Sequence, residues 1–291
     1  MQEYKYTFSD GLVGSCARFD KEQPKAVVQI IHGLKEHHRR YHHLAEYLNN
    51  NGYAVFVSDN RGHGYSVNDE YPLGYMTDLN RMVEDQFELT KYIKTQYENV
   101  PLYILGHSFG SMLARCYIQT HDSEISKLVL SGTVGYDNLV TIAYPLGKII
   151  NKLKGKKGYS SILHAIADNG DISWVCSNED TMEKYINDHF CTGYKYMNAS
   201  IDTLFHAMKE LHNVKAYQCN NPNMPILSIA GEKDPVTKGD KGIEDSIKTL
   251  ETIGYKNVKS IVYSNMLHEV LNETGKEQVY SDLLNFLDSN N

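Results

Sequence analysis

Short apolar runs recur along most of the chain, and amphipathic or polar segments long enough for helices separate them. The runs begin at six positions: Ala26, Tyr53, Leu102, Lys127, Pro225 and Lys259. Continuous apolar runs of this kind are typical of parallel strands that are buried on both faces of a sheet. Before them, residues 4–8 and 14–19 flank Ser9-Asp10-Gly11 and predict an antiparallel hairpin. The pattern therefore predicts an α/β fold with a mostly parallel central sheet, an N-terminal antiparallel hairpin and helices on both faces.

In the middle of the chain this alternation of strands and helices stops. Helical periodicity dominates there, with amphipathic candidates over Leu139–Leu153 and Ile201–Leu211. A helical insertion between two core strands is expected to cover the edge of the sheet from which it leaves. We therefore predict a core made of residues 1–133 and 224–291, with residues 134–223 inserted as a helical cap.

Composition narrows the class of protein. The chain has 291 residues, 41% of them hydrophobic, and its net charge of −7 argues against nucleic acid as a partner. Five cysteines, odd in number and without a Cys-x-x-Cys pair, indicate reduced thiols. Residues 1–6 lack the basic-then-apolar pattern of a signal peptide, and no apolar run approaches the length of about 18 residues that a membrane helix needs. We therefore expect a cytoplasmic protein.

The first chemical signal is Gly106-His107-Ser108-Phe109-Gly110, between the apolar run 102–105 and a predicted helix over 111–120. Gly-x-Ser-x-Gly at a strand-to-helix junction is the nucleophile elbow of α/β-hydrolases. The turn is so sharp that the serine backbone is strained, and glycine on either side lets the strand and helix approach. This context predicts that Ser108 is a nucleophile, with an ordinary serine in a glycine turn as the alternative.

A serine nucleophile needs a histidine to take its proton and a carboxylate to orient that histidine. In α/β-hydrolases the chain order is Ser, then Asp or Glu, then His, each just past a later strand. Asp234 follows the run that begins at Pro225, and His268 follows the last run. The chain order therefore predicts a triad of Ser108, Asp234 and His268, and Glu232, earlier on the same loop as Asp234, is the rival acid.

Acyl transfer also needs donors for the oxyanion of a tetrahedral intermediate. The run that begins at Ala26 leads directly into His32-Gly33-Leu34, where Gly33 permits a close backbone approach. We expect the backbone amides of Leu34 and Phe109 to form the oxyanion hole. Chemistry of this kind needs no cofactor and no metal.

Several other residues are candidates for substrate contact: Gly33, Glu36, Arg40, His107 and Trp174. Glu36 and Arg40 have i, i+4 spacing and are expected to pair, with contact to the polar end of a substrate as a further role. Trp174 is expected to pack in the core of the cap, with a substrate platform as the alternative.

Two clusters admit more than one interpretation. His38 and His42 have helical i, i+4 spacing and can share an ion, but the sequence supplies no carboxylate or cysteine set to complete a metal site. We therefore expect this histidine cluster (His37, His38, His42 and His43) to be a polar helix face near the mouth of the site. A basic patch, formed by Lys148, Lys152, Lys154, Lys156 and Lys157, is expected to be solvated, with docking onto anionic lipid as the alternative.

Three motifs resemble those of one family. Segment 32–41 resembles the His-Gly-x-x-Glu-His-x-x-Arg-Tyr signature of monoglyceride lipases and bacterial lysophospholipase-type hydrolases, in the α/β-hydrolase superfamily. Segment 59–66 resembles their Asp-x-x-Gly-His-Gly-x-Ser loop, and segment 268–273 resembles their His-Glu-x-Leu-Asn-Glu ending. The likeness extends to the predicted cap at Trp174, and it implies the triad named above. Leu271 stands near the position of a further histidine that helps some monoglyceride lipases to hold glycerol, so that route to glycerol recognition is absent here.

The resemblance implies a serine hydrolase that cleaves the carboxylic ester of a single-acyl lipid, either monoacylglycerol or lysophospholipid. The alternatives are a small-ester or aryl carboxylesterase, a thioesterase or an aminopeptidase on the same fold, and an inactive hydrolase fold used as a ligand-binding protein. Epoxide hydrolases and haloalkane dehalogenases are disfavoured because they place Asp where Ser108 stands. The expected partner is therefore a small-molecule or lipid ester, with transient membrane contact through the cap as a further expectation.

Overall fold

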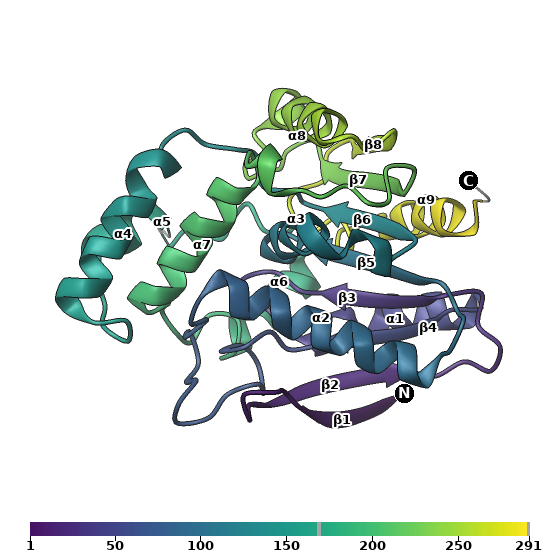
Figure 1. Cartoon of the computed structure of the whole chain (residues 1–291), viewed down its shortest axis with the longest axis horizontal. Helices are drawn as coiled ribbons and strands as arrows, with labels where there is room; N and C mark the ends of the chain where they lie inside the picture. Colours follow the sequence, from purple (N-terminus) through teal and green to yellow (C-terminus); the bar gives the residue numbers. More distant parts are fainter. Residues whose placement is uncertain (168–169, 290–291) are drawn as a thin grey trace.

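A computed structural model describes residues 1–167 and 170–289 of the chain and contains one eight-stranded sheet (Figure 1). The strand order across the sheet is β1-β2-β4-β3-β5-β6-β7-β8. The pairings β1·β2 and β2·β4 are antiparallel, and all later pairings are parallel. The strands are β1 (Gln2–Thr7), β2 (Val13–Phe19), β3 (Val27–Ile31), β4 (Ala54–Ser58), β5 (Leu102–His107), β6 (Lys127–Ser131), β7 (Pro225–Gly231) and β8 (Asn257–Tyr263). The predicted α/β-hydrolase architecture, with its N-terminal antiparallel hairpin, is thereby confirmed.

Helices cover both faces of this sheet because successive residues of each central strand point to opposite sides. One apolar core joins the strands to α2 (Leu79–Gln96), α3 (Phe109–His121) and α8 (Gly239–Ile253). A second core, on the other face, joins them to α1 (His42–Asn50) and α9 (Lys276–Asp288). Adjacent strand residues such as Ile104 and Leu105 belong to different cores, which explains why the central strands are continuous apolar runs.

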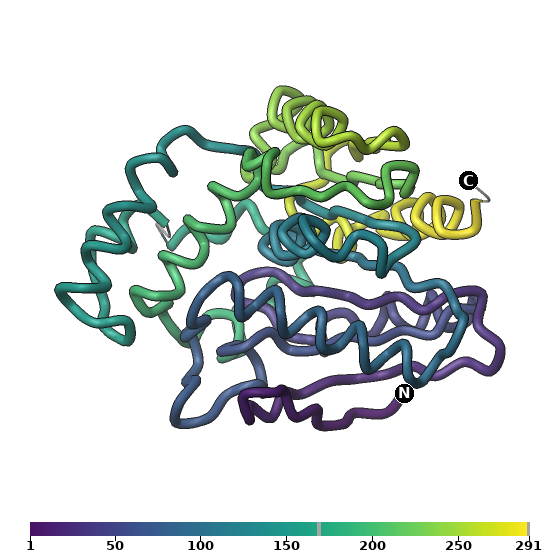
Figure 2. Tube along the Cα trace, in the orientation of Figure 1, coloured from purple at the N-terminus to yellow at the C-terminus, as the bar shows by residue number. Residues whose placement is uncertain are grey.

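Between β6 and β7 the chain leaves the sheet and forms a group of helices. In chain order these are α4 (Val140–Lys154), α5 (Ser161–Ala167), α6 (Glu179–Asn187) and α7 (Asn198–Glu210). Figures 1 and 2 show α4, α5 and α7 beside the sheet, beyond the strand ends, rather than stacked on either face. Short 3-10 turns occur at η1 (His38–Tyr41), η2 (Asp122–Glu124) and η3 (Val214–Ala216). Residues 168–169 of the predicted cap and residues 290–291 of the predicted core lie outside the described residues.

The last strand departs from its prediction in two ways. It begins at Asn257 rather than Lys259, and most of its residues are exposed or half-buried instead of buried. The reason is its place in the sheet, since β8 is an edge strand with a neighbour, β7, on one side only. A strand that carries Lys259 is compatible with such an edge, where a charged side chain also discourages pairing with other chains.

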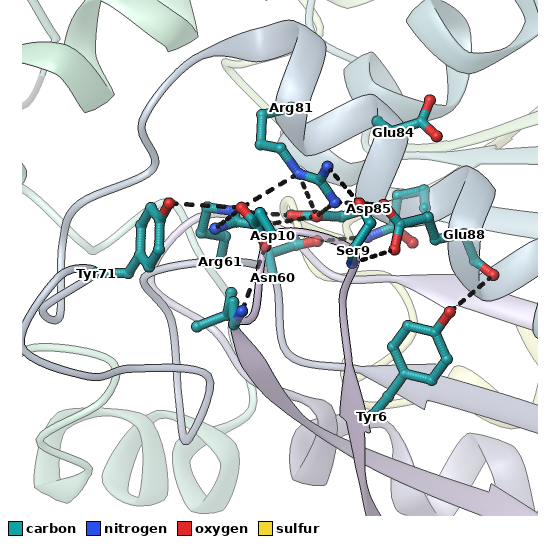
Figure 3. A network of polar contacts seen from close by, with 12 residues as sticks. Tyr6, Ser9, Asp10, Asn60, Arg61, Tyr71, Arg81, Glu84, Asp85 and Glu88 are labelled. Carbon is teal, nitrogen blue, oxygen red and sulfur yellow. Dashed lines mark hydrogen bonds and ion pairs between the residues drawn. The ribbon is translucent and has the colours of Figure 1, made fainter.

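A buried ionic network fixes the loop after β4 to its surroundings (Figure 3). Arg61 is fully buried, and its guanidinium makes a two-bond pair with Asp85 of α2, at 3.0 and 2.9 Å. Its Nη1 lies 2.9 Å from Oδ2 of Asp10, in the β1–β2 turn. Because removal of Arg61 would leave Asp85 charged and buried, the pair holds its segments firmly in place. The network therefore anchors segment 59–66 between the hairpin and α2.

The five cysteines of the chain are free thiols, and Cys219 is the one that is not buried. Within the described parts of the chain, no helix combines the length and the apolar character that crossing a membrane requires.

Candidate active site

The predicted elbow is present at the end of β5. Ser108 has φ 52° and ψ −119°, a backbone conformation that residues other than glycine rarely adopt. It lies directly before α3. Its amide donates to the carbonyl of Ser131 at 2.8 Å, which fixes the turn against β6. A Cβ on Gly106 would collide with the carbonyl of Gly110, and one on Gly110 would collide with that of Ile31. Glycine at positions 106 and 110 therefore allows β5 and α3 to pack closely on either side of the strained serine.

His268 and Asp234 form a buried pair at the carboxyl ends of the last two strands. Nδ1 of His268 lies 2.8 Å from Oδ2 of Asp234, and Oδ1 of Asp234 accepts from the amide of Val236 at 2.8 Å. The bond to a carboxylate places a proton on Nδ1 and leaves Nε2 as the acceptor, and His268 and Ser108 line the same cavity. Nε2 is buried and makes no hydrogen bond in this structure. Hydrogen bonds between nucleophile and base are often long in free enzymes and shorten when substrate binds.

The rival acid Glu232 does not contact His268. Its side chain is exposed and accepts from the amide of Asn265 at 2.9 Å. Of the two acids on this loop, Asp234 is the one placed to orient the imidazole.

The electrostatic surroundings of His268 favour its protonated form. Burial alone would lower the pKa of His268, but the charge and hydrogen bond of Asp234, with smaller contributions from Glu269 and Glu36, raise it overall. A raised pKa makes the imidazole a stronger base.

The loop after β3 is held in a fixed conformation by side chains of its own. His32 Nε2 accepts from the amide of Asn60 at 2.8 Å, so its Nδ1 carries the proton and donates to the carbonyl of Gly33 at 2.7 Å. The amide of Gly33 donates to Glu36 at 2.7 Å. A Cβ on Gly33 would lie 2.9 Å from that of Ser108, which shows how closely this loop approaches the nucleophile. Because the Gly33 amide already donates to Glu36, the amides of Leu34 and Phe109 are the candidates for an oxyanion hole.

A buried ionic triplet backs this loop. Arg40 donates to Glu36 at 2.5 Å and makes two bonds to Glu269, at 2.6 and 2.7 Å. The Arg40 guanidinium holds the pKa of Glu269 low against burial, whereas burial and the Glu269 charge raise that of Glu36. Arg40 was predicted to contact substrate, but it lies behind the two carboxylates and does not line the cavity, whereas Glu36 and Glu269 do. Its donors are used inside the protein because the triplet neutralises charges that are buried on all sides.

His107, inside the elbow sequence, is buried and lines the cavity. Burial and the nearby His268 lower its pKa to about 3, so it is neutral at physiological pH. The two rings are 4.8 Å apart between centroids, and Nδ1 of His107 lies 3.2 Å from Oγ of Ser131. His107 therefore forms an uncharged wall next to the base.

The cavity in front of Ser108 has a volume of about 230 Å³ and a mostly apolar lining. Core and inserted segment both contribute apolar side chains to it: Leu34, Met76, Phe109, Met112, Ile201, Leu204 and Met208. Trp174 also lies in the wall, half-buried, with its ring 5.0 Å from His268 in an edge-to-face contact. The expectation that Trp174 packs in the interior of the cap is therefore wrong, because the loop before α6 runs beside the histidine loop and turns the indole toward the base.

Two contacts between the inserted segment and the core bear directly on the site. The hydroxyl of Tyr196 accepts from the amide of Lys35 at 2.7 Å and lies 2.8 Å from Nε2 of His63. The amides of His268 and Glu269 donate to the carbonyls of Trp174 and Val175, at 3.3 and 2.9 Å. Sequence reasoning missed Tyr196 and Glu269 as site residues. Glu269 had a signal, an acid directly after the predicted base, whereas the partner of Tyr196 is 161 positions away.

The histidine cluster is not a polar helix face. His37 and His38 are buried, and His38 lies in η1, ahead of α1, which begins at His42. Nε2 of His37 lies 2.8 Å from Asp188 of the inserted segment, and Nδ1 of His38 lies 2.7 Å from Asp59. The prediction failed because helical spacing alone does not show that a turn of 3-10 helix is covered by neighbouring loops.

An elbow serine, a buried Asp–His pair and an apolar cavity, all at the carboxyl ends of a sheet covered on both faces, define a serine hydrolase of the α/β-hydrolase class. The chain matches the family model Hydrolase_4, described as serine aminopeptidase, S33, over residues 22–275, and it belongs to this family. Monoacylglycerol lipase of Mycolicibacterium smegmatis is 26% identical to it over 266 residues, which are 91% of this chain and 88% of the relative. A phospholipase of Bacillus subtilis is 25% identical over 272 residues, 92% of this chain and 96% of that one. The crystal structure of a thermostable carboxyl esterase from Bacillus coagulans in complex with glycerol superposes with a TM-score of 0.88, at 27% identity, covering 99% and 97% of the two chains.

Proposed function

We propose that this chain is a serine ester hydrolase that cleaves single-acyl lipids, monoacylglycerol or lysophospholipid, through an acyl-enzyme intermediate. The observation that carries the proposal is the cavity, whose lining is mostly apolar and includes both the nucleophile Ser108 and the base His268. An apolar pocket with a few convergent polar groups is the form that a binding site for an acyl chain takes. Relatives named as monoacylglycerol lipase and phospholipase support the same substrate class.

In the acylation step, Nε2 of His268 takes the proton of Ser108 as Oγ attacks the ester carbonyl carbon. The carbonyl oxygen becomes an oxyanion, which the amides of Leu34 and Phe109 stabilise. The carbon–oxygen bond to the alcohol then breaks, and His268 donates its proton to the leaving oxygen. Asp234 remains ionised and stabilises the imidazolium that forms in between.

Deacylation repeats the sequence with water as the nucleophile. His268 removes a proton from water, the hydroxide adds to the acyl-enzyme carbonyl, and the same two amides receive the charge. When the bond to Ser108 breaks, His268 returns the proton to Oγ, and the product is the fatty acid, which loses its remaining proton to solvent as it leaves as a carboxylate. Each step needs only residues of this chain, without a cofactor.

Residues 134–223 act as a cap in this proposal and set substrate choice. Three apolar side chains of α7, Ile201, Leu204 and Met208, line the cavity opposite the core. Each buried CH₂ of an acyl chain contributes up to about 0.8 kcal/mol, roughly fourfold in kcat/KM, until the cavity is full. We therefore expect kcat/KM on p-nitrophenyl esters to climb from acetyl to medium chain length and then level off, because a cavity of about 230 Å³ is small.

The variant Leu204→Trp fills part of this wall and should lower the chain length at which the profile levels off. Ile186→Trp is the matched control, because Ile186 is 52% exposed on α6 of the inserted segment and does not line the cavity. A flat or falling profile from acetyl to decanoyl esters would reject the lipid substrate in favour of the small-ester alternative.

We further propose that the outer face of α4 docks on an anionic membrane surface. Four apolar side chains near or on α4 are more than half exposed: Leu139, Ile142, Ile149 and Leu153. At 100° per residue they fall within one stripe of about 80°. The basic patch supplies positive charge beside this stripe, on a chain whose net charge is −7. An apolar stripe with flanking lysines is the pattern of a helix that lies in the interface of an anionic bilayer.

Co-sedimentation with vesicles tests this docking. The parent should bind vesicles rich in phosphatidylglycerol more tightly than neutral phosphatidylcholine vesicles. Ile142→Ser with Leu153→Ser should weaken that binding about tenfold or more, because each buried aliphatic side chain contributes about 1.5–3 kcal/mol. Ile186→Ser is the control, since Ile186 is 52% exposed on α6, away from the stripe. Equal binding of parent and double variant would show that α4 is not the docking face.

The aminopeptidase alternative has one feature in its favour, the two carboxylates in the cavity wall that an α-ammonium group would seek. Both are already engaged by Arg40, and Glu36 also accepts from Gly33 and from Tyr41. The ammonium group of a peptide substrate would therefore have to compete with the Arg40 guanidinium for these carboxylates. Alanine p-nitroanilide in the same assay separates the two activities.

A cytoplasmic location, predicted from composition, belongs to this proposal as well.

A further inference from the structure

Three potential metal ligands from separate elements converge on the side of the hairpin. Glu3 comes from β1, His38 from η1 and His42 from the start of α1. One ligand atom of each lies within 4.8 Å of the other two. The rings of His38 and His42 are 5.4 Å apart between centroids, and Nε2 of His38 lies 3.5 Å from Oε1 of Glu3. Glu3 is the carboxylate that the sequence alone did not place beside the histidines.

The protons around His38 leave an electron pair pointing into this cluster. Oδ1 of Asp59 accepts two hydrogen bonds from His38, one from its backbone amide at 2.6 Å and one from Nδ1 of its ring at 2.7 Å. With one proton on Nδ1, the neutral ring has a lone pair on Nε2, which is buried and makes no hydrogen bond. That lone pair faces a carboxylate oxygen of Glu3. The two atoms are 3.5 Å apart, so a small shift of either side chain would let both bind one metal ion.

His42 offers a second ring nitrogen without a hydrogen-bond partner. Its Nε2 is buried, and its ring packs edge-to-face on Phe19. One ring nitrogen of His42 lies within 4.8 Å of the ligand atoms of Glu3 and His38.

The other charged neighbours orient the ligands. Arg39 donates to both oxygens of Glu3, at 2.8 and 3.0 Å, which keeps the carboxylate ionised and fixed. Each carboxylate oxygen still has a second lone pair for a metal. Asp59 binds His38 in the arrangement that often supports zinc-bound histidine, in which a carboxylate holds the nitrogen that does not bind the metal. Asp59 is itself fixed by the amide of Tyr65, at 2.7 Å.

Two other clusters of potential ligands are less free. In the cluster Glu36, His107 and Glu269, Arg40 already occupies both carboxylates. In the cluster His37, Asp188 and Cys191, the carboxylate is hydrogen-bonded to His37, and burial raises the pKa of the Cys191 thiol. In the cluster at the hairpin, by contrast, Nε2 of both histidines is buried without a hydrogen-bond partner.

We propose that Glu3, His38 and His42 form a zinc site, completed by a water molecule. Two imidazoles and one carboxylate are an established donor set for Zn²⁺, with bonds of about 2.0–2.2 Å in tetrahedral geometry. The ion ties strand β1 to η1, the segment that follows the oxyanion-hole loop. Its role is structural, because the cluster does not line the catalytic cavity. Binding to the folded chain alone raises stability in proportion to the logarithm of zinc concentration above Kd.

Isothermal titration of the metal-free protein with ZnCl₂ at pH 7.5, paired with thermal unfolding, tests the site. We expect one equivalent to bind and to raise Tm by several degrees. His42→Gln and Glu3→Gln should each weaken binding at least tenfold and remove the rise in Tm. His189→Gln is the matched control, because His189 is exposed and outside the cluster. Arg39→Gln removes the ion pair of Glu3 while keeping all three ligands, and it should still bind one equivalent.

His38→Gln is not the deciding variant, because a buried residue bonded to Asp59 is needed for folding as well. Two results would overturn the proposal: no saturable binding of one equivalent to the parent, or binding by His42→Gln and Glu3→Gln with the affinity of the parent. Ester hydrolysis by Ser108 is expected to continue without zinc, so failure of the zinc site and failure of the proposed function are separate outcomes.

Discussion

Ser108→Ala lowers kcat for ester hydrolysis by about a million-fold, the usual loss when a triad nucleophile is removed. The reason is that no other described side chain of the cavity stands at the elbow beside His268 and the amides of Leu34 and Phe109. Both serine and alanine carry a Cβ at φ 52°, so the strain of the turn is unchanged and the fold should remain. Turnover of p-nitrophenyl octanoate measures the loss, and circular dichroism with Tm checks the fold.

Ser111→Ala is the control for this variant. Ser111 is one turn into α3 and donates to the carbonyl of Ser108 at 2.6 Å, so it supports the elbow without facing the cavity. We expect it to retain activity within about tenfold, as for loss of one hydrogen bond. If Ser108→Ala kept activity within tenfold of the parent, the assignment of the nucleophile would be wrong.

Asp234→Asn lowers kcat by about 10⁴-fold, because an amide at this position stabilises the wrong tautomer of the base and no longer balances its positive charge. Activity needs neutral His268, so the rate rises with pH through its pKa. Since the surroundings raise this pKa, the midpoint for the parent should lie above the ordinary value of about 6.5. Loss of the Asp234 charge lowers the pKa, so the residual activity of the variant should reach its midpoint at lower pH. Profiles of kcat/KM from pH 5 to 9 measure both effects.

Glu232→Gln is the matched control, on the same loop and exposed. It should leave both rate and midpoint close to those of the parent. Full activity of Asp234→Asn together with loss in Glu232→Gln would reverse the assignment of the acid.

The sheet and the elbow were predictable from the sequence because their signals are local. Apolar runs fixed the positions of the central strands, and glycines around Ser108 fixed the turn. Chain order then placed Asp234 and His268 after later strands, at the same edge of a parallel sheet. The burial of β8 was not predicted, since an apolar run does not tell whether a strand has one neighbour or two.

The parts that the sequence did not predict are contacts between distant segments. Arg40 had the spacing to pair with Glu36, but nothing near it in sequence indicated Glu269, which is 229 positions away. The network of Asp10, Arg61 and Asp85 likewise joins a turn, a loop and a helix that no periodicity relates. Glu3 reaches His38 only because β1 lies at the edge next to β2. Side-chain pairs of this kind depend on register and packing, which a pattern along the chain does not contain.

Active-site labelling tests the central claim, that Ser108 is the acylated residue of a serine hydrolase, most directly. The folded chain is treated with a fluorophosphonate probe, and the adduct is counted by intact mass and located by tandem mass spectrometry of its peptides. We expect one adduct per chain, on Ser108, and none in Ser108→Ala. Absence of labelling in the folded parent, or stoichiometric labelling that persists in Ser108→Ala, would contradict it.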